Sequence, residues 1–155
     1  LGWWSCFDRF RCNRDLLLFA EGDYIDKEFP EYDPAQKELW AEYNRPWDYD
    51  HIVPQNTVNQ WDEQGANSWW LWCIGNLAAI PLEENRRKNK NPCWDYYDQQ
   101  SAPYPILNVA SFKHFVDSKE QVNLVDFRRQ VWWRFLKIYR CLYDNVARFN
   151  VRPHI

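Results

Sequence analysis

The fold is decided by the stretch Trp47-Asp48-Tyr49-Asp50-His51-Ile52-Val53-Pro54. Aromatic and β-branched residues run over the length of a strand and stop at proline, so we predict a strand over residues 47–53. Its end carries Asp50 next to His51. A carboxylate is a hard ligand for a cation, and an imidazole with an ordinary pKa near 6.5 is largely neutral at cellular pH. This pair is half of a metal-assisted hydrolytic site.

The residues that follow supply the other half. We expect a polar loop over residues 55–68, a second strand over 76–82 and a helix over 83–89 that ends before Pro92. If the two strands fold back as a hairpin, Asn85 on the helix offers its amide oxygen beside Asp50 and His51. Asp48 lies two residues before Asp50 and therefore projects to the same side of the strand, which makes it the alternative ligand.

The donor atoms indicate which metal would bind. One carboxylate, one amide oxygen and water suit octahedral Mg²⁺ or Mn²⁺ better than Zn²⁺, so we predict a single divalent ion of that type. Three neighbouring cations on the same helix, Arg86, Arg87 and Lys88, form a local basic patch. Such a patch would contact phosphates without reading base sequence.

These motifs resemble a known family. Asp50-His51-Ile52-Val53-Pro54-Gln55, then Asn76, then Asn85 nine residues later and Lys88 resemble the His-Asn-His (HNH) endonucleases of the ββα-metal superfamily. The flanking Arg-Pro-Trp-Asp-Tyr-Asp-His-Ile-Val-Pro and Ile-Gly-Asn-Leu segments look more like the C-terminal nuclease domains of GmrSD-type modification-dependent restriction and phage-defence proteins. The HNH domain of CRISPR nucleases shares the spacing but not the flanks.

The resemblance implies a role for each residue. His51 would be the general base, Asp50 and Asn85 the metal ligands, and Asn76 would hold the loop that carries His51. The phosphate would meet Arg86, Arg87 and Lys88. The last position of the signature holds Asn85 instead of histidine, a departure that concerns the metal's identity more than the chemistry. The implied activity is hydrolysis of DNA, duplex DNA above all, in a bacterial cytoplasmic restriction system, with targeting by an NTPase-like domain on the same or a partner chain.

The rest of the chain predicts a mainly helical surround. At 155 residues with 46% hydrophobic residues and 11 Trp, one α+β domain is expected, with helical flanks at 1–46 and 93–155 around a ββα-metal core at 47–92. We predict helices over 13–29, from Pro34 to Tyr43, over 109–116 and over 124–149, and a loop over 93–105. Cations on the last helix and acids between Glu21 and Asp50 are expected to face solvent.

Several other features bear on function. Five cysteines at irregular spacing indicate reduced, mostly buried thiols, and no stretch is apolar enough for a membrane span. His114 and His154 are expected to have no catalytic part. A first residue other than Met suggests the C-terminal part of a longer protein. A net charge of −3 confines any nucleic-acid contact to a local patch. Two other functions stay open: a catalytically idle DNA-binding or assembly module, and an HNH toxin effector.

Overall fold

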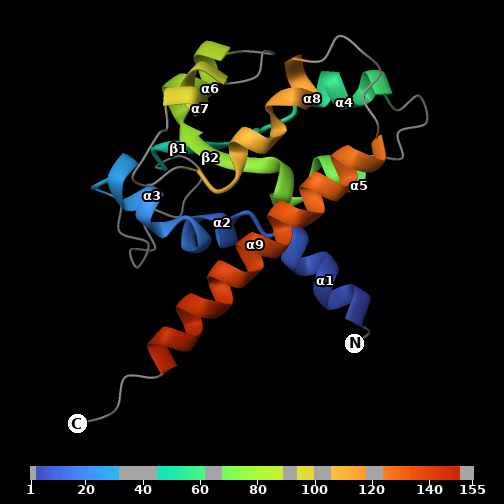
Figure 1. The fold of residues 1–155 in the computed structure, drawn as a ribbon. Helices are drawn as coiled ribbons and strands as arrows, with labels where there is room; N and C mark the ends of the chain where they lie inside the picture. The colour runs from blue at the N-terminus through green and yellow to red at the C-terminus, as the bar shows by residue number, and fades with distance from the viewer. Residues whose placement is uncertain are drawn as a thin grey trace.

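The fold surrounds a small sheet with helices, and Figure 1 shows the arrangement. The computed structural model describes residues 3–31, 45–61, 68–88, 94–99, 106–117 and 124–150. Within these residues the chain is mostly helical with a single two-stranded antiparallel sheet, in agreement with the predicted α+β class. The predicted helix from Pro34 to Tyr43 and His154 lie outside the described residues.

The sheet pairs the two strands that the sequence predicts. β1 (Trp47–His51) runs antiparallel to β2 (Leu77–Pro81), with Asp50 opposite Ala78 and His51 opposite Leu77. The helix α6 (Leu82–Lys88) follows β2 directly. β1 is shorter than the predicted strand over 47–53, because the chain bends at Ile52 and Val53. The Ile52 amide still donates to the Asn76 carbonyl at 2.9 Å.

Two segments predicted as loops contain helices. α4 (Gln55–Trp61) occupies the first half of the segment predicted as a loop over 55–68, and α7 (Trp94–Gln99) lies in the segment predicted as a loop over 93–105. α4 buries Val58, and α7 buries Trp94 and Tyr97. Helices this short are held by tertiary packing of a few apolar side chains, which a polar sequence pattern conceals. Between them, α5 (Ser68–Leu71) and the 3₁₀ helix η2 (Ile74–Asn76) lead into β2.

The N-terminal flank also differs from the prediction. It contains α1 (Trp3–Cys12), α2 (Asp15–Ala20) and α3 (Gly22–Glu28), so the single helix predicted over 13–29 is wrong. The break falls at Glu21, whose φ of −107° and ψ of 28° interrupt the helix. Glu21 is 5% exposed and Asp50 is 3% exposed, which corrects the expectation that the acids of this stretch face solvent.

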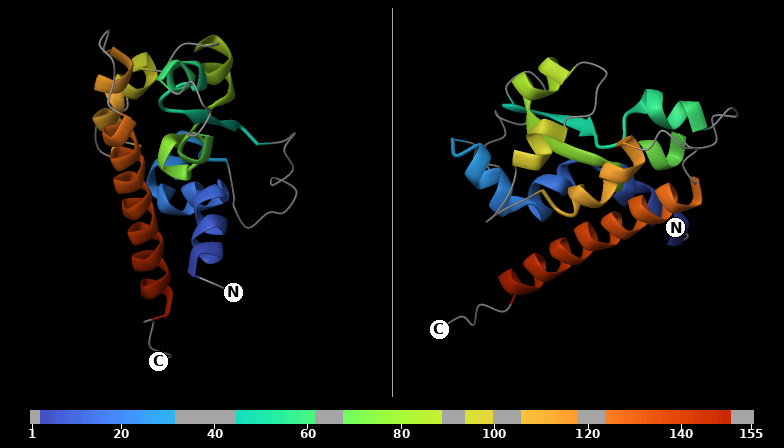
Figure 2. Two further views of the ribbon diagram at one scale, coloured as in Figure 1. Left: turned by 90° about the vertical axis from the view of Figure 1, so that its right-hand side faces the viewer. Right: turned by 45° about the horizontal axis from the view of Figure 1, so that its top comes forward.

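The C-terminal flank is dominated by α9 (Leu124–Asn150), which matches the helix predicted over 124–149. It is preceded by η3 (Val109–Phe112) and α8 (Lys113–Asp117), which cover the helix predicted over 109–116. α9 packs against η2 and α2 and lies along one side of the other elements (Figure 2). Its buried stripe follows the predicted spacing and consists of Phe127, Val131, Phe135 and Ile138.

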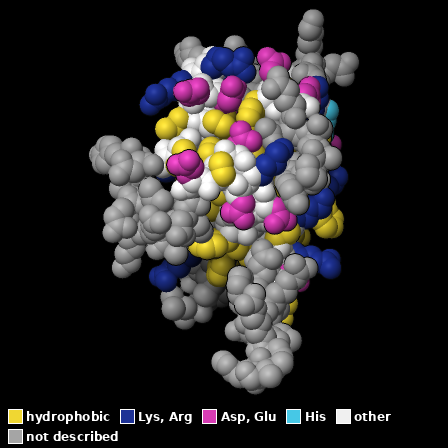
Figure 3. All heavy atoms as spheres, turned by 90° about the vertical axis from the view of Figure 1, so that its left-hand side faces the viewer, with side chains coloured by type: hydrophobic (Ala, Val, Ile, Leu, Met, Phe, Trp, Pro, Cys, Tyr) yellow, Lys and Arg dark blue, Asp and Glu magenta, His cyan; other side chains and the backbone are white. Residues whose placement is uncertain are grey.

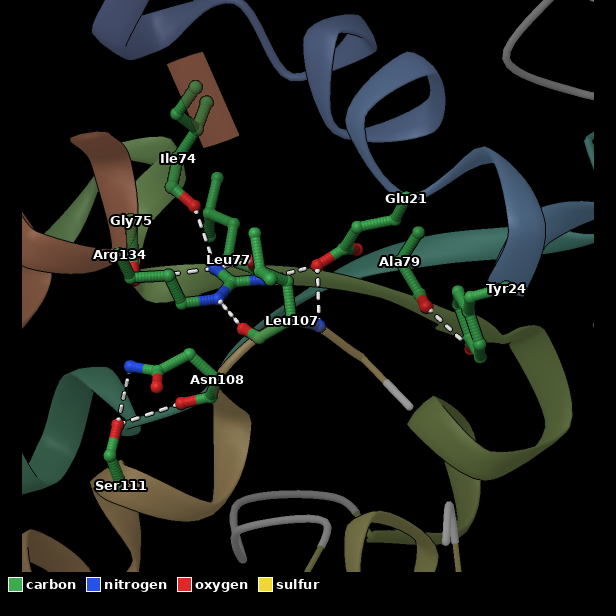
Figure 4. Close-up of polar contacts among 10 residues, drawn as sticks. All are labelled: Glu21, Tyr24, Ile74, Gly75, Leu77, Ala79, Leu107, Asn108, Ser111 and Arg134. Atoms are coloured by element: carbon green, nitrogen blue, oxygen red, sulfur yellow. Dashed lines mark hydrogen bonds and ion pairs between the residues drawn. The ribbon is translucent and has the colours of Figure 1, made fainter. Parts of the chain in front are cut away.

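One cation of α9 is buried, contrary to the expectation that all face solvent. Arg134 has no exposed surface. Its guanidinium pairs with Glu21 at 2.7 Å and donates to the carbonyl oxygens of Leu107, Ile74, Gly75 and Leu77 (Figure 4). Glu21 also accepts from the Leu107 amide at 3.1 Å. This network joins α9 to the segment that leads into β2, and it explains why α2 and α3 separate at Glu21.

The structure also bears on the predictions for the cysteine thiols, for membrane-spanning segments and for His114. Cys12, Cys73 and Cys141 are free, as predicted, but Cys12 is exposed and Cys141 only partly buried. Among the described helices, none combines the length and the apolar composition that a membrane crossing needs. His114 is exposed, and its ring lies against Phe115 with the ring centres 3.8 Å apart and the planes tilted by 40°.

Candidate active site

A polar pocket of about 460 Å³ opens at the end of β1 and is lined by residues of β1, α4 and α6. Its lining residues are Tyr49, Asp50, His51, Pro54, Gln55, Asn56, Asn59, Asn85 and Lys88. Asp50 and His51 are neighbours whose side chains leave opposite faces of a strand. Both reach the same pocket because the strand ends at His51 and the chain then bends. Asn85, nine residues after Asn76, completes the set that the sequence singles out.

Asp50 is the most enclosed polar group of the pocket. One carboxylate oxygen, Oδ1, forms an ion pair with the Lys88 ammonium. The other, Oδ2, accepts a hydrogen bond from the Tyr97 hydroxyl at 2.7 Å. A buried carboxylate needs such partners, because an unpaired buried charge is costly. Both carboxylate oxygens of Asp50 thus have a partner, and the group is held in one position.

Asn85 is oriented by Asp48, the alternative ligand. The Asn85 amide nitrogen donates to Asp48 Oδ2 at 2.7 Å. The other Asp48 oxygen accepts from the Tyr49 backbone amide at 2.8 Å and pairs with Arg45 at 3.3 Å. With its amide nitrogen turned to a carboxylate, Asn85 presents its carbonyl oxygen as the remaining donor atom. Asp48 is therefore placed to fix the orientation of Asn85, and it does not line the pocket itself.

His51 has an unusual environment for a histidine at a pocket. Its ring packs edge-on against Trp72, with the ring centres 4.5 Å apart. Burial, with a smaller contribution from the Arg14 guanidinium, lowers the pKa of His51 from 6.5 to about 4. Its Nε2 atom is buried and has no hydrogen-bond partner among the described residues. The imidazole is neutral at pH 7 and keeps one ring nitrogen without a protein partner.

Asn76 lies behind the pocket and not in it. Its side chain is fully buried and makes three hydrogen bonds, accepting from the Val53 amide at 3.1 Å and donating to the carbonyl oxygens of Val53 and Leu71, each at 3.2 Å. An amide side chain pairs here with the two backbone groups of a single residue. The contact fixes the bend that follows His51.

The three predicted phosphate contacts differ in their surroundings. Lys88 is 11% exposed and pairs with Asp50, and Arg87 is exposed and pairs with Glu84 at 2.6 Å. Arg86 is exposed. Of the three, Lys88 alone lines the pocket. Figure 3 shows acidic and basic side chains interspersed over the face seen there, so its charges are mixed.

The donor set can be compared with the needs of a metal ion. The described residues contain no group of three or more His, Cys, Asp and Glu side chains that could hold a metal. The pocket instead offers the carboxylate of Asp50 and the amide oxygen of Asn85, and the Asp50 carboxylate already faces a cation in Lys88. Few protein ligands, all of them oxygens, fit Mg²⁺ or Mn²⁺, which keep several waters. A thiolate or multi-histidine site for zinc is not formed by these pocket residues.

The structure also reveals pocket neighbours that the sequence reasoning missed. Tyr97 reaches Asp50 from α7, and Trp72 packs on His51. Asn56 and Asn59 line the pocket from α4. Their spacing of three residues matches one face of a helix and follows Pro54, which favours a helix start. That signal was available in the sequence, whereas nothing in the sequence placed Tyr97 beside Asp50.

Comparison with known proteins agrees with the sequence. The model of the family "GmrSD restriction endonucleases, C-terminal domain" matches residues 7–124. Neither a curated protein nor a solved structure matches the chain. The matched range contains β1, α4, β2 and α6, and every residue that lines the pocket falls within it. The resemblance to GmrSD proteins is confirmed, and the chain belongs to the family of C-terminal domains of GmrSD restriction endonucleases.

Proposed function

We propose that this restriction-endonuclease domain is a metal-dependent HNH nuclease that hydrolyses DNA phosphodiester bonds. Its β1, β2 and α6 would form the hairpin and helix of a ββα-metal site. One observation carries the proposal: Asp50, His51 and Asn85 come from two different elements and line one pocket. A binding surface has no need of a neutral imidazole beside two oxygen ligands.

The chain's own residues would divide the reaction as follows. Asp50 and Asn85 would hold Mg²⁺ or Mn²⁺, which supplies charge stabilisation for the phosphate and the departing 3′ oxygen. The His51 imidazole would accept a proton from the water whose oxygen attacks phosphorus. The bond from phosphorus to the 3′ oxygen then breaks, and that oxygen takes up a proton. Lys88 lines the pocket and would meet a non-bridging phosphate oxygen, with Arg86 and Arg87 on the same helix contacting flanking phosphates.

The wider role follows from the family. We propose that the domain cuts modified or foreign DNA in a bacterial anti-phage restriction system, and that an NTPase-like domain on the same or a partner chain supplies the targeting. The pocket supports a division of labour of this kind. Lys88 in the pocket and Arg86 and Arg87 on the same helix can contact phosphates, and such contacts do not read base sequence.

A second candidate function is a DNA-binding or assembly module without catalysis. The observation that favours it is the state of Asp50, because both of its oxygens have protein partners in Lys88 and Tyr97. An ammonium ion can replace a metal as the counter-charge of a structural carboxylate. Metal binding separates the two functions: a nuclease binds Mn²⁺ at Asp50, and an idle module does not.

Plasmid nicking tests the proposed function. The chain is incubated with supercoiled plasmid in Mg²⁺, in Mn²⁺ and in EDTA, using unmodified DNA and DNA with modified bases. We expect nicking with either metal and none in EDTA. Direct Mn²⁺ binding, measured by electron paramagnetic resonance, should fall in Asp50→Asn and stay unchanged in Asp98→Asn, an exposed acid paired with Lys113 on the surface. Absence of both metal binding and cleavage on every DNA overturns the proposal.

A further inference from the structure

A second pocket, lined by aromatic rings and arginines, lies where α1, α5 and the start of α9 meet. Its volume is about 500 Å³, and its lining residues are Phe7, Trp69, Trp70, Trp132, Arg128 and Arg129. Pockets of this size accept small organic groups. The hydrolytic chemistry above uses none of these side chains.

The rings of this pocket are held in fixed positions. Phe7 lies 5.7 Å from Trp69 and 5.0 Å from Trp132, measured between ring centres. Trp70 packs edge-on against Trp69 at 4.4 Å, and Trp132 stacks on Phe135 at 5.5 Å. Because their neighbours already order these rings, a planar ligand would bind without first having to arrange them.

The polar groups at the rim are mostly cations. Arg128 and Arg129 line the pocket, and the Arg11 guanidinium lies over the Trp69 ring at 4.0 Å. The acids nearby are Asp126, which pairs with Arg129 at 3.0 Å, and Asp8, which pairs with Arg11 at 2.7 Å. Both members of the Arg129–Asp126 pair are at least half exposed, and exposed pairs are weak, so a phosphate can compete for Arg129. Two arginines, Arg128 and Arg129, thus stand beside the aromatic rings in a chain whose net charge is −3.

The aromatic pocket is also connected to the candidate active site. Trp72, which packs on His51, follows Trp70 by two residues at the end of α5. Arg14 lies 5.5 Å from the centre of the Trp72 ring. One short chain segment therefore serves both pockets: Trp69 and Trp70 line the second pocket, and Trp72 packs on His51.

We propose that this aromatic pocket takes an unpaired nucleobase of the DNA strand, with Arg128 and Arg129 contacting its phosphates. An aromatic lining with a cationic rim fits a flat ring joined to an anion, and it is how proteins bind single-stranded nucleic acid without reading its sequence. A paired base cannot enter such a pocket, so the substrate class is DNA with at least one unpaired nucleotide near the cleaved bond. The naming of this substrate rests on the proposed nuclease function.

Binding in EDTA tests the pocket without cleavage. The ligands are a single strand of roughly twelve nucleotides carrying the fluorescent base 2-aminopurine, a strand of equal length and charge with abasic sites, and free 2-aminopurine nucleotide. We expect the base-bearing strand to bind roughly 5- to 100-fold more tightly than the abasic strand, with quenched fluorescence, as base stacking on aromatic side chains predicts. The free nucleotide should bind much more weakly, because it lacks the neighbouring phosphates.

Matched variants separate this role from general effects. Trp70→Leu should remove the preference for bases, and its control Trp133→Leu, at a ring that is 55% exposed and lines neither pocket, should keep it. Arg129→Gln should weaken both strands, whereas Arg140→Gln, another exposed arginine of α9 paired with an acid, should not. Equal melting temperatures show that the variants fold.

Equal affinity for base-bearing and abasic strands, or equal behaviour of Trp70→Leu and Trp133→Leu, overturns the proposal. Binding of the free nucleotide as tightly as the strand assigns the pocket to a soluble nucleotide and overturns the substrate named here. Base-dependent binding without metal-dependent cleavage rejects the nuclease function and leaves the base pocket standing. Cleavage without base-dependent binding does the reverse.

Discussion

Two neighbouring residues, Asp50 and His51, meet opposite electrostatic environments. Asp50 is paired with the Lys88 ammonium and accepts a hydrogen bond from the Tyr97 hydroxyl. His51 is pressed against Trp72, where burial and Arg14 favour its neutral form. A neutral imidazole next to a carboxylate in a different environment is an arrangement that acid–base chemistry uses.

Protonation of His51 makes stability depend on pH. In the unfolded chain its pKa is near 6.5 and in the folded protein about 4, so between these values the unfolded chain binds the proton more tightly. Folding stability must therefore fall as the pH falls through this window. For the metal-free protein we expect His51 alone to cost about 2 kcal/mol of unfolding free energy between roughly pH 7 and pH 5.

The measurement is urea denaturation in EDTA at the two pH values. His51→Gln should show a smaller loss on acidification than the wild type by that amount, and His114→Gln, at an exposed histidine, should match the wild type. An identical pH dependence in His51→Gln and the wild type would show that His51 is not buried in its neutral form.

Arg134 is the second residue whose environment predicts a large effect. Replacing it by Met leaves the Glu21 carboxyl group buried without its cationic partner. Burial raises the pKa of Glu21, because it disfavours the charged form of the carboxyl group. Removing one member of a buried ion pair typically costs about 3–5 kcal/mol. We expect a loss of that size in Arg134→Met by chemical denaturation, and less than about 0.5 kcal/mol in Arg140→Met, at an arginine that is 84% exposed. Similar losses in both variants would contradict the structural role of the pair.

Among the helices and strands, the sequence predicts those with a long periodic pattern of apolar residues or a clear local signal such as a proline. The aromatic and aliphatic period of α9 identifies its length and its buried face, and Pro54 limits the first strand. The short helices α4 and α7 could not be predicted from the sequence pattern, because Val58 and Tyr97 stabilise them only through contacts with distant parts of the chain. The break between α2 and α3 was not predicted either. Glu21, which stands at this break, pairs with Arg134 of the distant α9.

The contact between η2 and α9 gives an element-scale prediction. A Cβ added at Gly75 would collide with the Val131 backbone carbonyl, and a main-chain group cannot move aside as a flexible side chain can. We expect Gly75→Ala to destabilise the protein by about 1–3 kcal/mol or more. Gly22→Ala is the matched control, because a Cβ there meets nothing within 4 Å. Thermal unfolding of both variants checks this, and a Gly75→Ala protein as stable as Gly22→Ala would show that α9 does not approach η2 so closely.

At the scale of the whole molecule, the charges limit how DNA can bind. The chain has a net charge of −3, and the cations near the two pockets are Arg86, Arg87, Lys88, Arg128 and Arg129. Each phosphate contact to duplex DNA adds about −0.9 to the slope of log affinity against log salt. We expect a slope no steeper than about −5 from titrations over roughly 50–200 mM salt. A slope of about −8 or beyond would require a further basic surface.

The sequence motif predicts that the site residues come together in one place. The spacing of Asp50, His51, Asn76 and Asn85 anticipates a hairpin and a helix around one pocket, and the fold places these residues there or directly behind it. The partners of these residues could not be predicted. Lys88 and Tyr97 reach Asp50 from 38 and 47 residues away, and such contacts depend on the packed fold and not on local pattern.

Single-turnover nicking of plasmid in Mg²⁺ shows whether His51 is the general base. A positioned general base is typically worth ~10²–10⁴-fold in rate. We predict that His51→Ala loses at least 100-fold while binding Mn²⁺ as the wild type does, and that His114→Ala cleaves at the wild-type rate. Wild-type cleavage by His51→Ala would contradict the account.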